Sequence, residues 1–181
     1  MTAADDHELD AETGLPIGRL VDDPSPAPWP ARRVIEGRYA RLEPLEPVRH
    51  AADLYAAATA PGAAARYRYL FSSVPDDAAR HRAALEQQAA SRDPLVFAVI
   101  DRATDRAAGQ QSFLRITPGD RAIEIGSILW GPTIARTRVA TEANYLFARH
   151  AFDDLGYRRY EWKCDDLNAP TDCDRRLSGS Q

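Results

Sequence analysis

The sequence contains two cysteines, one methionine and one lysine, and it has no long apolar run. Cys164 and Cys173 form neither a disulfide framework nor a zinc-type spacing, which argues against a structural metal and favours a reducing compartment. No stretch approaches the ~20 apolar residues that cross a bilayer. The first residues are acidic, whereas a signal peptide begins with basic and then apolar residues. The sequence therefore predicts a cytoplasmic protein without a metal or a membrane partner.

Positive charge is carried almost entirely by arginine, because Lys163 is the single lysine. The net charge is −4, and residues 1–30, with seven acidic residues and one arginine, contribute −6, so the remainder carries +2. This small excess fits a local anion pocket better than a nucleic-acid interface, which usually has a strongly basic face. The planar guanidinium group suits phosphate and carboxylate ligands. We therefore expect no nucleic-acid partner.

The chain length of 181 residues suits one domain with tails. Residues 1–36 are expected to form an acidic, proline-rich arm, of which residues 1–30 have no packed element of their own and Trp29 holds the end against the body. The domain is expected over residues 37–169. Residues 170–181 form a divergent tail.

Hydrophobic periodicity predicts an α/β (α+β) fold with a mixed, mostly antiparallel sheet flanked by helices. The apolar run 95–100 indicates a central strand, and a stripe of apolar residues from Val139, ended by Gly156, indicates a long amphipathic helix. A strand, a helix and a further strand in that order imply a parallel pair beside a three-strand meander. Strands are expected at 39–43, 95–100, 109–116, 123–130 and 158–164, helices at 48–60, 73–91 and 139–155, and a loop or irregular turn at 66–71.

The most informative segment is a strand over 124–130, a turn through Gly131 and Pro132, and the helix start at 136–143. The first N–H groups of a helix lack intrahelical partners and lie at the positive end of the helix dipole. Arginines at 136 and 138 add charge at the same place. This arrangement predicts an anion site for a cofactor.

The order of these elements, with an arginine-rich turn before the third helix, resembles the GNAT superfamily of acyl-CoA-dependent N-acyltransferases. It looks closest to the branch of ribosomal-protein N-terminal alanine acetyltransferases. The resemblance covers about 37–169 and is most specific at 124–126, 136–143 and 161–168.

In that family, the turn before the third helix holds the pyrophosphate of coenzyme A through backbone N–H groups. The strands before and after this helix splay apart, so that the pantetheine arm enters between them. For Arg136 and Arg138, simple surface charge is the alternative to phosphate contact. The resemblance and the helix start together imply acetyl-CoA as co-substrate, with cofactor-binding residues Ser127, Ile128, Leu129, Arg136, Arg138, Val139, Ala140, Thr141 and Asn168.

The sequence departs from the family at two places. Val139 and Thr141 replace the small residues of the phosphate-binding pattern, and a β-branched residue adopts positive φ only at a cost of ~1–2 kcal/mol. The loop is therefore expected to follow an ordinary path into the helix. Beyond residue 169 the family's last helix and final strands are not recognisable, so the chain resembles a C-terminally truncated member.

Acyl transfer to an amine benefits from a base, because an alkyl amine with a pKa near ~10.4 is protonated at neutral pH. Glu124 is the first candidate, since it alternates with Ile123 and Ile125; an ordinary exposed carboxylate is the alternative. Glu161 is a weaker candidate, because its strand alternation could equally leave it in solvent. Backbone N–H groups near 127–129 would donate hydrogen bonds to the oxyanion that develops during acyl transfer, if a bulge exposed them.

Aromatic residues Tyr67, Tyr69 and Phe71 occupy the segment that lines the acceptor pocket in the resembled family, with core or lid packing as the alternative. His150 lies beside the apolar stripe and is expected to be packed rather than to act as a base. Cys164 is expected to be a small buried residue rather than a nucleophile.

The resemblance implies an N-acetyltransferase that moves an acetyl group directly from acetyl-CoA to a primary amine, either a protein N-terminus or a small amine. The alternative is a catalytically inactive domain that binds coenzyme A or a protein, or a truncated non-functional family member. Without its last strands the sheet would keep an unpaired edge, which favours a homodimer.

Overall fold

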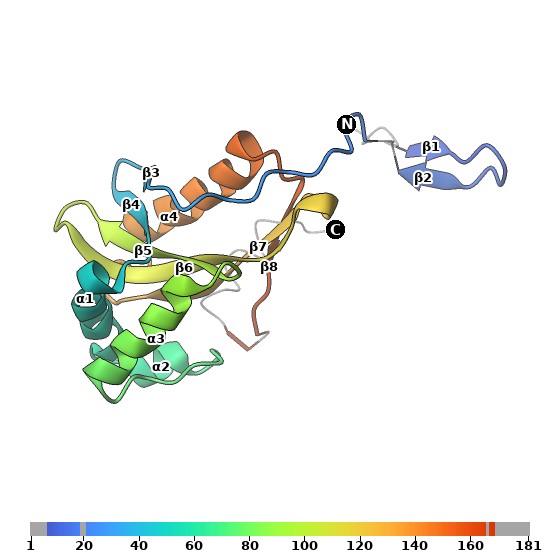
Figure 1. Cartoon of the computed structure of the whole chain (residues 1–181). Coiled ribbons are helices and arrows are strands. Elements are labelled where there is room, and N and C mark those ends of the chain that lie inside the picture. Colours follow the sequence, from blue (N-terminus) through green and yellow to red (C-terminus); the bar gives the residue numbers. More distant parts are fainter. Residues whose placement is uncertain (1–6, 19–20, 166, 169–181) are drawn as a thin grey trace.

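A computed structural model describes residues 7–18, 21–165 and 167–168, and its centre is a six-stranded sheet in the order β3-β4-β5-β6-β7-β8 (Figure 1). All neighbouring strands of this sheet are antiparallel except β7 and β8, which are parallel. The predicted meander and parallel pair are confirmed. The strands are β3 (Ile35–Glu36), β4 (Ala40–Pro44), β5 (Leu95–Asp101), β6 (Arg106–Thr117), β7 (Ala122–Trp130) and β8 (Arg159–Trp162).

Helices cover both faces of the sheet (Figure 1). One face carries α1 (Pro47–Thr59), α2 (Ala63–Tyr67) and α3 (Ala78–Ala90), and the other carries α4 (Arg138–Arg149). A 3-10 turn (Pro118–Asp120) joins β6 to β7, and α4 ends in a π-helical turn (His150–Asp154) before Gly156, whose φ is +69°. Among the described residues, no helix is long and apolar enough to cross a membrane.

Two predicted boundaries on the first face are wrong. The segment expected as a loop begins inside α2. From this helix the Arg66 guanidinium donates to the carbonyls of Ala60 (3.0 Å) and Pro61 (2.9 Å), which follow the end of α1. The helix expected to open at Ser73 instead begins at Ala78. Its N-cap is Asp77, whose carboxylate accepts a hydrogen bond from the Arg80 N–H at 2.8 Å.

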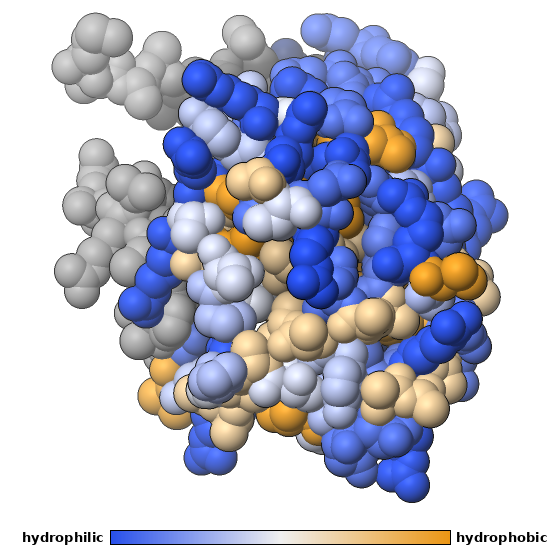
Figure 2. Space-filling view, turned by 90° about the vertical axis from the view of Figure 1, so that its left-hand side faces the viewer, coloured by the Kyte–Doolittle hydropathy of each residue, from blue (hydrophilic) through white to orange (hydrophobic). Residues whose placement is uncertain are grey.

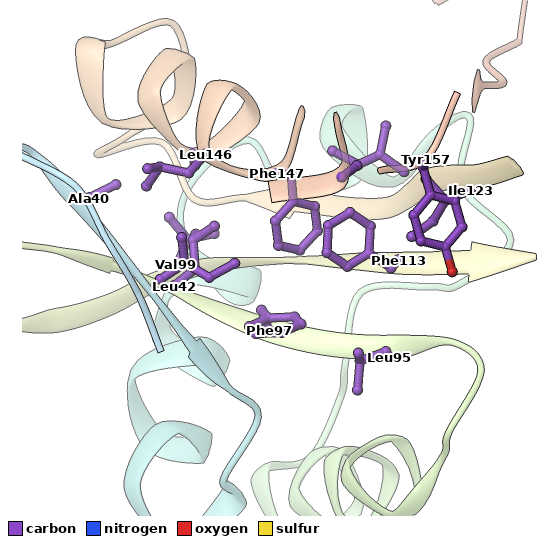
Figure 3. Close-up of a cluster of buried hydrophobic side chains, with 14 of the residues drawn as sticks. Ala40, Leu42, Leu95, Phe97, Val99, Phe113, Ile123, Leu146, Phe147 and Tyr157 are labelled. Carbon is purple, nitrogen blue, oxygen red and sulfur yellow. The ribbon is translucent and has the colours of Figure 1, made fainter. Parts of the chain in front are cut away.

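The main core lies between the sheet and α4 (Figure 3). Phe97, Phe113 and Phe147 are fully buried there, and Phe113 stacks on Phe147 with ring centroids 3.8 Å apart. Phe97 meets Phe147 edge to face at 5.3 Å. The predicted apolar stripe of α4 supplies this side of the core. A second cluster on the opposite face contains Leu45, Ala51, Leu54, Leu85, Val96, Ala98, Ile100 and Ala107.

The N-terminal residues contain more structure than expected. A hairpin of β1 (His7–Leu9) and β2 (Pro16–Gly18) stands away from the sheet (Figure 1). The Asp10 carboxylate closes the turn of this hairpin by accepting a hydrogen bond from the Thr13 N–H at 2.8 Å. The acidic composition of the segment predicts no such turn. Further along, Ala27 is buried in the main core. Trp29 packs against the body as predicted, with Arg92 over its ring at 4.3 Å.

Glu142 fixes α4 to the turn between β3 and β4. Its carboxylate accepts from the backbone N–H groups of Arg38 (2.9 Å), Tyr39 (2.5 Å) and Ala40 (2.7 Å). Partial burial raises the pKa of Glu142, the three N–H groups lower it, and the net result is a pKa below the ordinary value of 4.5. The ionised carboxylate therefore holds the helix in place.

Replacing Glu142 with alanine should lower the free energy of unfolding by about 1–3 kcal/mol at pH 7, because it leaves three N–H groups without their acceptor. The stabilisation is fully present above pH 4.5, the ordinary pKa, and is lost as the pH falls through the lower folded-state pKa. Urea unfolding of the wild type and E142A at several pH values measures this difference. A gap between the two proteins that stays constant down to pH 2 would contradict the assignment.

Candidate functional site

The parallel pairing of β7 and β8 covers only part of β7. The ladder runs from Ala122 opposite Arg159 to Ile125 opposite Trp162. From Gly126 to Trp130, β7 has no partner on this side in the part of the chain that the structure describes. Backbone N–H and C=O groups along this edge are therefore available to a ligand. The gap lies where the two strands were expected to diverge.

A β-bulge lies at the beginning of this unpaired stretch. Gln110 pairs with Leu129 and Ser112 pairs with Gly126, so two steps along β6 oppose three steps along β7. Ser127 takes the left-handed conformation, with φ of +49°. A bulge of this kind turns backbone groups out of the ladder. The structure thus contains the irregularity that the sequence could not reveal.

Gly131 begins the loop that leads from β7 to α4. A Cβ atom there would lie 2.8 Å from the Ala108 carbonyl oxygen and 2.9 Å from the Ala57 Cβ, so only glycine allows this close approach. The Ile134 and Ala135 N–H groups both donate to the Gly131 carbonyl. Arg136 then has φ of +61°. The chain therefore makes its left-handed step at Arg136.

Thr137 is the N-cap of α4, and its hydroxyl accepts from the Val139 N–H at 3.2 Å. The Thr141 N–H bonds the Thr137 carbonyl at 3.1 Å. Two of the predicted phosphate-binding amides therefore have protein partners. The N–H groups of Arg136, Arg138 and Ala140 have no hydrogen-bond partner among the described residues. The β-branched Val139 follows the helical path that the sequence predicted.

Two guanidinium groups lie over one aromatic ring at this helix start, and Arg136 lies in the loop just before the helix. Arg138 lies over the Tyr39 ring at 4.4 Å, and Arg38 lies over the same ring at 5.1 Å. Within the described residues, neither of these arginines nor Arg136 forms a salt bridge. All three are exposed. Arg38 was not predicted from the sequence, because it precedes a strand and only the fold brings it beside α4.

Glu124 is buried, with its carboxylate held by two cations, so the expected alternative of an ordinary exposed carboxylate is wrong. Its Oε2 lies 2.9 Å from the Arg115 Nε and 2.5 Å from the Lys163 Nζ. Glu161, opposite Glu124 in the parallel ladder, shares Lys163 at 3.2 Å and also binds Arg159 at 2.8 Å. Both candidate carboxylates therefore belong to one ion-pair network. Nothing in the sequence pointed to Arg115 or Lys163 as partners.

The remaining predicted residues occupy different environments. Tyr67 is buried at the end of α2, whereas Tyr69 and Phe71 are exposed. His150 is buried and bonds Asp154 at 2.6 Å, which confirms its packed role. Cys164 is exposed, so the prediction of a buried cysteine is wrong, because β8 ends at Trp162.

Asn168 ends the described segment 167–168, and its N–H donates to the Asp165 carbonyl at 3.0 Å. The predicted tail of residues 170–181, with Cys173, lies outside the described residues.

A surface hollow of about 280 Å³ borders the loop into α4 on the side of α1. Figure 2 views the molecule from that side and shows pale apolar side chains in a band bordered by hydrophilic ones. The hollow is lined by Asp53, Ala56, Ala57, Ala60, Asp101, Thr104, Arg106, Ala107, Ala108, Pro132 and Thr133.

A mixed sheet with an interrupted parallel pair, a bulged strand and a capped helix start beside the interruption is an arrangement shared with solved GNAT acetyltransferase structures. The family model described as acetyltransferase (GNAT) domain matches residues 40–172. The chain belongs to the GNAT acetyltransferase family.

Solved structures agree with this membership. A GCN5-related N-acetyltransferase from Brucella melitensis is 47% identical, with a TM-score of 0.80 over 85% of this chain and 68% of that chain. A probable acetyltransferase of the GNAT family from Chromobacterium violaceum is 31% identical, with a TM-score of 0.81 over 92% of this chain and 83% of that chain. No curated protein gave a significant match.

A more distant structure shares the fold. The acetyl transferase from Salmonella typhimurium that modifies the N-terminal serine of 50S ribosomal subunit protein L7/L12 is 17% identical. Its TM-score is 0.66, over 80% of this chain and 83% of that chain. This likeness concerns the fold alone.

Proposed function

We propose that the protein is an acetyl-CoA-dependent N-acetyltransferase that transfers an acetyl group directly to a primary amine, either a protein N-terminus or a small amine. The observation that carries the proposal is the unpaired edge of β7 from Gly126 to Trp130, which leads to the arginine-rich start of α4. The edge of β7 offers backbone groups to an extended ligand, and the start of α4 offers N–H groups and charge to phosphates. Coenzyme A has an extended pantetheine arm and a pyrophosphate.

The proposed diphosphate contacts lie at the start of α4. The N–H groups of Arg136, Arg138 and Ala140 point away from any partner in the described chain, and Arg136 and Arg138 add guanidinium charge. The N–H groups of Val139 and Thr141 are bonded to Thr137, so they cannot contact the phosphate directly. These two residues contribute to phosphate binding only through the helix dipole. Phosphate would therefore contact fewer amides than the sequence predicted.

The proposed pantetheine contacts lie along β7, at the backbone of Ser127, Ile128 and Leu129, with Asn168 beyond β8. Bound acetyl-CoA supplies the acyl group as a thioester. A backbone N–H turned out of the ladder by the bulge would stabilise the negative charge that develops on the thioester oxygen. Such a donor is worth about 10²–10³ in rate in other acyl-transfer enzymes.

Glu124 is the base that the sequence offers. To receive a proton from the acceptor amine, its carboxylate would first have to release Lys163 or Arg115. Tyr67, Tyr69 and Phe71 are proposed to contact the acceptor, since Tyr67 ends α2, the other two follow it, and α2 lies on the face of the sheet that carries α1 and α3 (Figure 1). The acceptor would thus approach from the side opposite α4.

Release of coenzyme A thiol from acetyl-CoA over a panel of amines and N-terminal peptides tests the proposal. We expect turnover with at least one amine and an increase in the melting temperature with coenzyme A. Stabilisation without turnover on any amine would favour the catalytically inactive alternative. Absence of both would overturn the proposal.

A further inference from the structure

His81, in the first turns of α3, has a ring nitrogen that the fold buries without a partner. Its Nε2 is shielded from solvent and forms no hydrogen bond among the described residues. A buried polar atom that lacks a protein partner costs free energy unless a water molecule or a ligand supplies the hydrogen bond. The sequence pattern gave no reason to select His81.

The ring borders a small cavity of about 10 Å³, the size of one water-sized group. Leu129 belongs to the unpaired stretch of β7, so the cavity reaches the strand that we assign to the thioester. It lies on the face opposite α4, from which the acceptor would approach. The cavity is lined by Leu54, Ala57, Ala58, His81, Gly109, Gln110, Leu129 and Gly131.

The surroundings of His81 keep its ring neutral near pH 7. Burial lowers its pKa from the ordinary value of 6.5. From α1, Tyr55 packs against the ring at 5.8 Å between centroids, and β6 contributes the uncharged amide of Gln110. The charged groups nearest in sequence are paired elsewhere: Arg80 with Asp76, and Arg82 with Glu86. Asp77, one turn earlier, caps the helix.

Glu124 differs from His81 because its acceptor atoms already have partners in the protein. Its carboxylate is already shared between Arg115 and Lys163, whereas the Nε2 of His81 has an unused lone pair in the neutral Nδ1–H tautomer. A group with an unoccupied acceptor position beside the reacting strand is better placed to take a proton than a carboxylate held by two cations.

We propose that His81 is the base of the transfer reaction, with its Nε2 accepting the proton of the acceptor ammonium through one water molecule in the cavity beside Leu129. This inference rests on the proposed function. The ammonium loses one proton through this water to Nε2, and the amine lone pair then forms the C–N bond. The C–S bond breaks with its electron pair on sulfur, and the second proton of the nitrogen goes to the thiolate. The imidazolium finally returns its proton to solvent.

The test measures kcat/KM for thiol release between pH 5.5 and 9 in the wild type, H81Q and H81N, with R82Q as control on the same helix. In the wild type we expect kcat/KM to fall as the pH drops through the pKa of His81, below 6.5. In H81Q and H81N, kcat should be about 100-fold lower and the fall of kcat/KM at low pH should disappear, while the Kd for coenzyme A stays unchanged. R82Q should match the wild type.

Two further measurements separate proton transfer from packing. Imidazole added to H81A should restore part of the activity, in proportion to the concentration of neutral imidazole, and circular dichroism should show native folding of each variant. The role of His81 would be overturned if H81Q kept the wild-type kcat and pH profile. It would also be overturned if the loss of activity followed a loss of coenzyme A binding and imidazole did not rescue it. A wild type inactive on every amine would instead overturn the proposed function, and this inference with it.

Discussion

The double variant R136A/R138A should bind coenzyme A about 100-fold more weakly than the wild type at low salt. Each hydrogen bond between a guanidinium group and a phosphate contributes about 1.5–3 kcal/mol, and Arg138 gives up part of this gain because it leaves the Tyr39 ring. Neither side chain has a carboxylate partner among the described residues, so their removal breaks no salt bridge there. Calorimetric titration with coenzyme A measures the change.

Salt and a matched control distinguish a specific site from general charge. The difference between wild type and R136A/R138A should shrink as salt rises from 0.05 to 0.5 M, because the ions screen exposed charges. R80A/R82A removes the same charge from α3, where both arginines pair with neighbouring carboxylates, and should bind like the wild type. Equal affinities of both double variants would remove the phosphate assignment.

Replacing Phe147 with alanine should lower the free energy of unfolding by about 3–5 kcal/mol, because the deleted ring leaves a cavity in the main core. Phe147 is fully buried, stacks on Phe113 and meets Phe97 edge to face (Figure 3). It also joins α4 to the sheet, so the cavity would weaken the element that carries the proposed phosphate site. Urea unfolding followed by circular dichroism gives the value.

Phe152 provides the matched control for this substitution. It lies one turn further along, is 44% exposed and contacts Tyr160 alone among the aromatic rings described. F152A should therefore cost less than about 1 kcal/mol. If F147A and F152A were equally stable, the main core would not lie where the structure places it.

Most of the fold follows from patterns that the sequence displays locally. The apolar run of β5 and the stripe that includes Val139, Ala143 and Phe147 are strong signals, because burial requires those residues to be apolar. Weak signals failed where a single side-chain hydrogen bond decided a helix boundary. Arg66 completes α1 and Asp77 displaces the expected cap of α3. Neither effect has a periodic signature.

The candidate site was predicted only as far as its backbone elements. The strand, the turn and the arginines at the start of α4 are contiguous in sequence, so their proximity could be foreseen. Arg38 precedes β4, Lys163 follows β8 and His81 lies in α3, so the pairing of these strands and the packing of α3 on the sheet bring them to the site. The positive φ of the bulge falls on Ser127 and not on the neighbouring Gly126, so the sequence carries no clear sign of it. Tertiary structure, rather than local propensity, assembles these parts.

Amide hydrogen exchange with and without coenzyme A tests the central claim most directly. The claim is that an acyl-CoA lies along the unpaired edge of β7 and against the start of α4. We predict slower exchange at residues 127–130 and 136–140 when coenzyme A is present, and unchanged exchange in the exposed hairpin of β1 and β2. Unchanged exchange in both segments at saturating coenzyme A would contradict the account.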